Sequence, residues 1–187
     1  TTSPLKEKLK KSQLTIGTWL TIPHRTVIEI FAKSGFEWVV IDLEHAPINI
    51  SQAAELIAHI QGNGMQALVR VHKNEEVIIK NVLDAGADGI VVPMIKNKQE
   101  AEKAVSYTYY PPKGKRGVGL NRAQYYGEGF EGYKAWLEKN IVIIAQIEHI
   151  DAINNLEEIL FVKGIDGTII GPYDLSGSMG HPGDYNR

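Results

Sequence analysis

The stretch IVIIAQIE, residues 141–148, is a run of apolar, mostly β-branched residues that stops at a carboxylate, Glu148. Such a run is typical of a parallel strand that is covered on both faces. The stretch DGTIIG (166–171) repeats the pattern, and Asp174 follows it by three residues. Carboxylates at the carboxyl ends of several buried parallel strands are typical of an α/β barrel enzyme, so these two runs predict both the fold and the place of the active site.

Short apolar runs alternate with stretches of helical period along the whole chain, and this alternation indicates βα units. We expect strands near residues 14–20, 37–43, 66–71, 88–93, 116–120, 141–148 and 166–171, and helices near 26–35, 51–62, 74–86, 98–107, 130–139 and 150–161. Residues 109–119 and 171–183 are rich in Pro or Gly and are expected to be loops, and the lysine-rich N-terminal stretch is expected to be a solvated helix.

We interpret residues 1–187 as one domain, an α/β TIM-type (β/α)8 barrel whose last βα portion is missing from this chain. Seven strands are predicted, and a complete barrel takes about 250 residues. An open parallel sheet of seven strands is the alternative, because the order of strands in a sheet cannot be derived from one sequence.

The composition is that of an ordinary globular protein, with 43% hydrophobic and 22% charged residues and a net charge of −2. This balance gives no reason to expect nucleic acid or a membrane surface as a partner. No apolar stretch approaches the ~18 residues that span a bilayer, and we expect no signal peptide. The absence of cysteine excludes disulfides, thiolate metal sites and thiol nucleophiles. A cytoplasmic protein is expected.

Candidate catalytic residues follow two of the earlier predicted strands. His45 lies in IDLEHAP (41–47), and a histidine can act as a general base near neutral pH when a carboxylate, here Asp42, orients its other nitrogen. A surface histidine beside a helix N-terminus is the alternative. Arg70 ends another apolar run, and its planar fork matches a carboxylate or an enolate. A structural ion pair with Glu44 or Asp42 is the alternative for Arg70.

The two later carboxylates are candidate metal ligands, because Glu148 and Asp174 follow adjacent predicted strands. Two hard oxygen ligands suit Mg²⁺ or Mn²⁺ and leave positions open for water and a chelating substrate. A carboxylate pair that shares a proton is the alternative. Gln146 faces the same side of its strand as Glu148 and can hydrogen-bond to the same ligand. The loop GPYDLSGSMG (171–180) can hold an anion on its backbone N–H groups, and it matches no nucleotide-binding motif.

Six segments of this sequence resemble the HpcH/HpaI family of metal-dependent class II 2-keto-3-deoxy acid aldolases. They are GTWL, GFEWVVIDLEHAP, VLDAGADGIVVPM, YYPPKGKRGVG, AQIEHIDAINN and GIDGTIIGPYDLSGSMG, and they occur in this order between about residue 14 and residue 183. The resemblance implies a barrel of the pyruvate/phosphoenolpyruvate-binding kind. It also implies an enzyme that reversibly cleaves a 2-keto-4-hydroxy acid into pyruvate and an aldehyde.

The resemblance implies a role for each matching residue. Glu148 and Asp174 would bind a divalent metal (Mg²⁺, Mn²⁺ or Co²⁺) that chelates the keto acid. Arg70 would stabilise the enolate oxygen of the metal-bound pyruvate enolate. His45, oriented by Asp42, would relay the proton of the 4-hydroxyl. The residues that would contact the substrate are Arg70, Gln146, Gly171, Pro172, Asp174, Leu175 and Ser176.

Two further expectations concern assembly and alternatives. Asp84 matches an acidic position that the family places near the site of a neighbouring subunit, and members typically form homohexamers in which a C-terminal helix packs on a neighbour. A related lyase or decarboxylase that uses the same enolate is the second reading of the function. A non-catalytic subunit that binds a keto acid is the third.

Overall fold

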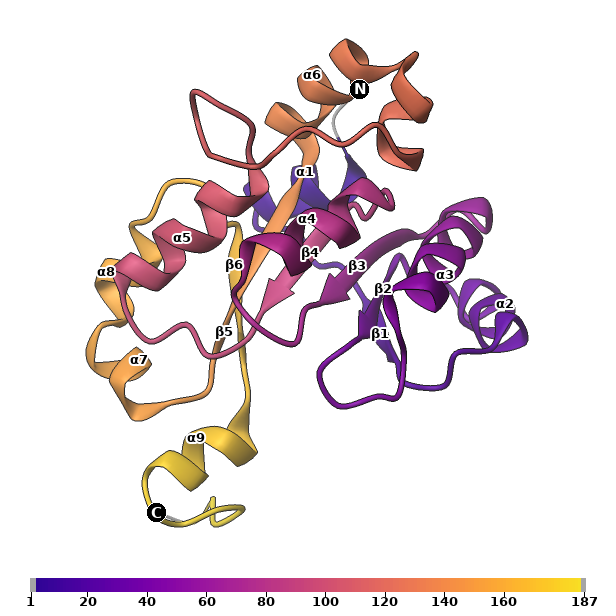
Figure 1. The fold of residues 1–187 in the computed structure, drawn as a ribbon. Helices are drawn as coiled ribbons and strands as arrows, with labels where there is room; N and C mark the ends of the chain where they lie inside the picture. Colours follow the sequence, from indigo (N-terminus) through magenta and orange to yellow (C-terminus); the bar gives the residue numbers. More distant parts are fainter. Residues whose placement is uncertain (1–2, 186–187) are drawn as a thin grey trace.

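Six parallel strands form a single sheet in residues 3–185, which are the residues that the computed structural model describes (Figure 1). The strands are β1 (Gly17–Leu20), β2 (Trp38–Asp42), β3 (Gln66–Arg70), β4 (Gly89–Val92), β5 (Val142–Ile147) and β6 (Gly167–Ile170). Each strand pairs with the next strand in the chain, so the order in the sheet is β1-β2-β3-β4-β5-β6. The sheet curls into half of a barrel, which agrees with the predicted α/β class.

Helices lie in every connection between successive strands and cover the outer face of the sheet (Figure 1). They are α2 (Arg25–Lys33), α3 (Ile50–Gly62), α4 (Glu76–Asp84), α5 (Lys98–Thr108), α6 (Phe130–Asn140), α7 (Ile150–Asn154) and α8 (Leu156–Leu160). Buried isoleucines such as Ile28, Ile57 and Ile79 pack from these helices against the strands and form the larger core. Asn49 begins α3 with a capping box, which is a local signal for the start of a helix.

The concave face of the sheet carries a smaller core of Val40, Leu68, Val91 and Val142. Side chains alternate along a strand, so the residues two positions after Val40 and Leu68 lie on this same face. Those residues are Asp42 and Arg70. The interior of the half-barrel is therefore apolar in its middle and charged at the carboxyl ends of the strands.

Helix α1 (Pro4–Lys10) closes the amino-terminal end of this interior. Leu5 is buried in the concave core, and the Nζ of Lys6 lies 2.5 Å from Oδ1 of Asp166 and 2.7 Å from the carbonyl oxygen of Ile141. The prediction of a solvated N-terminal helix is therefore wrong for the side that carries Leu5 and Lys6. The many lysines suggested a fully solvated helix, but Leu5 and the ion-paired Lys6 face inward.

The predicted strand at 116–120 is not formed, and the structure has six strands in residues 3–185 where seven were expected. Arg116 donates its backbone N–H to Tyr109 instead of to a strand, and its side chain is buried. Val118 and Leu120, which gave the segment its strand-like alternation, are exposed. The alternation arises from glycines between two apolar side chains, and it has no sheet to pack against.

Two other predictions differ in detail. Residues 171–183 contain a helix, α9 (Pro172–Ser178), which lies beyond the carboxyl end of β6 (Figure 1). The predicted helix at 150–161 is divided at Asn155 into α7 and α8. A short 3-10 segment, η1 (Arg122–Gly127), precedes α6. In residues 3–185, none of the helices has the length and apolar character needed to cross a membrane.

Candidate active site at the carboxyl ends of the strands

Arg70 is held from three sides at the end of β3. Its Nε and Nη2 donate to Oδ1 and Oδ2 of Asp42 at 2.9 and 2.7 Å, and its Nη1 lies 3.3 Å from Oε2 of Glu44. The guanidinium also lies 4.5 Å from the centroid of the Trp19 ring. The register of the sheet pairs Asp42 with Arg70, so the contact follows directly from the fold. Asp42 uses two of the five N–H donors, and the group is therefore oriented in advance with donors left for an anion.

Asp42 is ionised in this arrangement. Burial acts to raise the pKa of Asp42, but the hydrogen bonds from Arg70 and from the backbone N–H groups of His45 and Glu44 outweigh it and lower that pKa below its ordinary value. The prediction that Asp42 orients the imidazole of His45 differs from the structure, because Asp42 accepts the backbone N–H of that residue. The imidazole Nε2 lies 3.9 Å from Oε2 of Glu44 instead, and its side chain is 63% exposed.

Glu44 is the carboxyl that lies between the arginine and the imidazole. Burial raises the pKa of Glu44 against the opposing charge of Arg70, and the negative charge of Glu148 adds to the rise. Its buried Oε2 is close to Arg70 but out of line for a hydrogen bond, so it has no hydrogen-bond partner. A carboxyl whose pKa is raised in this way, beside a cation and an imidazole, is a candidate for proton transfer.

Glu148 follows β5 and is only 2% exposed. Its Oε2 accepts a hydrogen bond from Nε2 of Gln146 at 2.5 Å, which confirms that the two side chains face the same way, and its Oε1 accepts one from the backbone N–H of Met94 at 2.8 Å. A Cβ at Gly171 would lie 2.7 Å from Oε2 of Glu148, so only glycine fits there. Oε1 of Gln146 is buried without a partner, which leaves an unused acceptor beside the carboxylate.

Asp174 lies on the first turn of α9 and is exposed. It comes three residues after Gly171, whose backbone approaches Glu148, and it leaves β6, the parallel neighbour of β5. In the described part of the chain, no group of three or more histidine and acidic side chains lies together as a metal site. A metal site formed by the two carboxylates of Glu148 and Asp174 stays a prediction from the sequence.

The other predicted contacts of the substrate lie on the same short helix. The hydroxyl of Ser176 donates to the carbonyl oxygen of Tyr173 and accepts from the backbone N–H of Gly183, each at 2.9 Å. This hydroxyl therefore stabilises the loop that follows α9. Pro172 is exposed and Leu175 is half-buried on the same helix.

Asp84 lies at the opposite end of the molecule. It ends α4 shortly before β4 begins, which places it at the amino-terminal end of the sheet. It accepts hydrogen bonds from Arg116 at 2.5 Å and from Gln124 at 3.0 Å, and Arg116 also donates to the hydroxyl of Tyr133. Within this chain Asp84 belongs to a buried structural network, and the fold does not bring it to His45.

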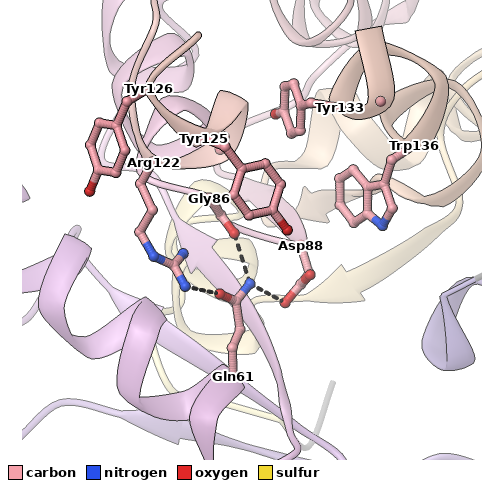
Figure 2. A pocket seen from close by; sticks show the side chains of 10 residues that line it. Gln61, Gly86, Asp88, Arg122, Tyr125, Tyr126, Tyr133 and Trp136 are labelled. Carbon is pink, nitrogen blue, oxygen red and sulfur yellow. Dashed lines mark hydrogen bonds between the residues drawn. The ribbon is translucent and has the colours of Figure 1, made fainter. Parts of the chain in front are cut away.

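A cleft of about 670 Å³ also opens at the amino-terminal end (Figure 2). Gln61 bridges its floor, because Nε2 donates to Asp88 at 2.9 Å and Oε1 accepts from Arg122 at 2.8 Å. The rings of Tyr125 and Trp136 border it. None of the predicted site residues lines this cleft, so the candidate active site is the cluster at the other end of the strands.

Sequence reasoning missed two parts of that cluster. The ring of Trp19 packs against the guanidinium of Arg70. The sequence indicates this residue only through its position near the end of the first predicted strand. Met94 contributes a backbone N–H, and a pattern of side chains cannot predict a hydrogen bond from the main chain. Its place directly after Pro93, at the end of β4, is the one available indication.

Known proteins are similar to nearly the whole of this chain. The family model of the HpcH/HpaI aldolase/citrate lyase proteins matches residues 15–187. The 2-keto-3-deoxy-L-rhamnonate aldolase of Escherichia coli strain K12 is 40% identical over 182 residues, which cover 96% of this chain and 68% of the relative. The same-named protein of Shigella sonnei strain Ss046 is 40% identical over 183 residues, or 97% of this chain and 68% of the relative.

Solved structures are similar over the same length. An HpcH/HpaI aldolase/citrate lyase family protein from Burkholderia cenocepacia J2315 has a TM-score of 0.93 and 31% identity, and the match covers 100% of this chain and 75% of that one. The citrate synthase SbnG has a TM-score of 0.85 and 32% identity, with 96% and 70% of the two chains covered. The chain therefore belongs to the HpcH/HpaI aldolase/citrate lyase family.

Proposed function

We propose that this carbon–carbon lyase is a metal-dependent aldolase that reversibly cleaves a 2-keto-4-hydroxy acid into pyruvate and an aldehyde. The observation that carries the proposal is the cluster at the carboxyl ends of the strands, where Asp42 orients Arg70 in advance and Glu44, the other acid beside Arg70, feels the charge of the buried Glu148. The similarity to 2-keto-3-deoxy-L-rhamnonate aldolases favours a 3-deoxy sugar acid as the class of substrate.

Glu148 and Asp174 are the residues that would hold the divalent metal (Mg²⁺, Mn²⁺ or Co²⁺). The donor set fits such an ion, because both ligands are hard carboxylate oxygens. The hydrogen bonds from Gln146 and Met94 orient Glu148, as outer partners commonly do for metal ligands. A metal bound here would act as a Lewis acid that polarises the C2 carbonyl of the keto acid.

The protein groups account for the movement of charge and protons. When the C3–C4 bond breaks, its electron pair moves toward the C2 oxygen, and Arg70 stabilises the negative charge that develops there. Asp42 holds the guanidinium in place, so no reorganisation is needed during the reaction. The 4-hydroxyl loses its proton as the aldehyde carbonyl forms, and the exposed His45, whose Nε2 lies 3.9 Å from Oε2 of Glu44, receives this proton and passes it to solvent. A proton taken up from solvent at C3 of the enolate then gives pyruvate.

A direct test is the exchange of pyruvate methyl protons with deuterated water, followed by proton NMR with Mg²⁺, Mn²⁺ or Co²⁺. We expect the wild type to exchange and Arg70→Ala to exchange at least ~10²-fold more slowly, as when an oxyanion donor is removed. Arg25→Ala is the matched control, because Arg25 is exposed and pairs only loosely with Glu55, at 3.7 Å. A folded, metal-loaded wild type that exchanges no protons contradicts the proposal.

A second candidate is a related lyase or decarboxylase that directs the same enolate to another reaction. The similarity to the citrate synthase SbnG favours it, because that protein bears a different activity on the same fold. Analysis of the products formed from keto acids distinguishes the two enzymes. A non-catalytic keto-acid-binding subunit, the third reading, would bind pyruvate without exchanging its protons.

We further propose a fold of the closed (β/α)8 kind and assembly as a homo-oligomer, a hexamer by family resemblance. Relatives extend beyond the matched region, and apolar side chains such as Val118, Leu120 and Ile170 are exposed in this chain. The role of Asp84 at a neighbouring site belongs to the same proposal. A cytoplasmic location and the absence of nucleic-acid and membrane partners stay predictions from the sequence.

A further inference from the structure

Met94 has a backbone conformation that residues other than glycine rarely adopt. Its φ is 54°, in the left-handed region, where the Cβ of an L-residue crowds the following carbonyl oxygen. The side chain is 40% exposed, so burial of the methionine does not explain the conformation. Strained residues of this kind gather at functional sites, where the surrounding structure holds them.

The backbone N–H of Met94 points at the active-site carboxylate, and the chain adopts the left-handed conformation at this same residue. The ladder between β4 and β5 ends at the pair Val92 and Ala145, and Met94 follows two residues later. Its N–H therefore lies beyond the sheet, and it donates to Oε1 of Glu148 at 2.8 Å. Glu148 is almost fully buried, and burying a polar group away from water costs free energy unless it is hydrogen-bonded.

The second oxygen of the carboxylate is fixed independently. Gln146 donates to Oε2 at 2.5 Å, and Gly171 lies so close to this oxygen that a side chain at position 171 would clash with it. Each oxygen then has one donor, and each retains a lone pair because a carboxylate offers about four acceptor positions. The orientation of those lone pairs is set by Met94 on one side and by Gln146 on the other.

We propose that Met94 is a positioning residue whose left-handed backbone orients Glu148 to receive a divalent cation. The inference rests on the proposed function, which makes Glu148 a metal ligand. The side chain of Met94 has no part in it, so the residue acts through its main-chain N–H alone. Loss of an outer partner of a metal ligand typically weakens metal binding by about 10–100-fold.

The test compares variants that differ in backbone and equally lack the methionine side chain. Met94→Gly keeps the N–H and adopts a positive φ without strain, whereas Met94→Pro removes the N–H and fixes φ near about −65°. The dissociation constant of Mn²⁺ is measured by electron paramagnetic resonance on the full chain after chelation of bound metal, with circular dichroism to verify folding. We expect Met94→Pro to bind Mn²⁺ about 10–100-fold more weakly and Met94→Gly to bind it as the wild type does.

Met94→Val provides a second variant if proline disturbs the fold, because a β-branched residue keeps the N–H but strongly disfavours positive φ. We expect it to weaken Mn²⁺ binding in the same direction. Equal affinities in all folded variants, or equal losses in Met94→Gly and Met94→Pro, overturn the positioning role and leave the metal site standing. A wild type that binds no Mn²⁺ overturns this inference together with the proposed function.

Discussion

At the scale of single residues, the site is organised by competition for one cation. Asp42 and Glu44 both approach Arg70, and only Asp42 obtains aligned hydrogen bonds. Burial raises the pKa of Glu44, whereas the hydrogen bonds that Asp42 accepts outweigh burial and lower the pKa of Asp42. One acid remains charged to hold the arginine, and its neighbour is better able to exchange a proton beside His45.

The hydroxyl of Tyr133, beside the buried Arg116, gives a prediction about stability at alkaline pH. Burial raises the pKa of Tyr133 to about 12, although Arg116 beside its hydroxyl opposes the shift. Tyrosine in the unfolded chain ionises near about pH 10, so the folded state alone keeps this proton between pH 10 and about 12. The stabilising contribution is complete below pH 10 and is lost as the pH rises through that range.

We therefore expect the advantage of the wild type over Tyr133→Phe to shrink above pH 10, by about 1.4 kcal/mol per pH unit at most. Urea unfolding of both proteins across this range measures the difference in the free energy of unfolding. A difference that stays constant with pH would show that this hydroxyl does not keep its proton in the folded state.

At the scale of elements, helix α1 makes buried contacts that the sequence did not predict. Leu5 enters the concave core, while Lys6 joins α1 to the residue just before β6 through Asp166. The ion pair therefore fastens α1, near the start of the chain, to β6 at the far edge of the sheet. Leu5 packs there with Val40, Leu68, Val91 and Val142, so α1 supplies part of the apolar contact inside the half-barrel.

Removal of this contact should be costly. We expect Leu5→Ala to lower the free energy of unfolding by about 2–5 kcal/mol, as for other buried leucines. Leu14→Ala is the matched control, since Leu14 is 82% exposed and its loss should change stability by no more than about 0.5 kcal/mol. Denaturant titration checks both, and equal effects in the two variants would show that α1 does not contribute to the core.

At the scale of the whole molecule, the half-barrel has two open edges in residues 3–185. β1 pairs only with β2, and β6 pairs only with β5. Thr168 and Ile170 of β6 are exposed, although a parallel strand is normally covered on both faces. An exposed, apolar strand edge is a template for pairing with another chain.

We expect residues 1–187, expressed alone, to self-associate through β6, and Ile170→Lys to reduce this association. Val77→Lys adds the same charge at an exposed site on α4 and should leave association unchanged. Sedimentation velocity over a range of concentrations measures the effect. A monomeric wild type, or an equal effect of both lysines, would rule out the open edge as the contact.

The sequence by itself determined the βα architecture and most of the site. Apolar runs that end in charged residues placed Arg70 and Glu148 at the carboxyl ends of strands, and the two-residue period put Gln146 beside Glu148. These features are local, because the spacing of side chains along one strand decides which face each of them occupies. The same spacing misled at 116–120, where glycines imitate the alternation of a strand without a neighbour to pair with.

Only the tertiary structure decided which groups are partners. The register of β2 against β3 places Asp42 beside Arg70, and the end of β4 brings a main-chain N–H to Glu148. Such choices depend on the competition of groups that are far apart in the chain and on backbone donors that leave no trace in the pattern of side chains. A residue type indicates what a side chain can bind, whereas the packing of the strands decides which partner is within reach.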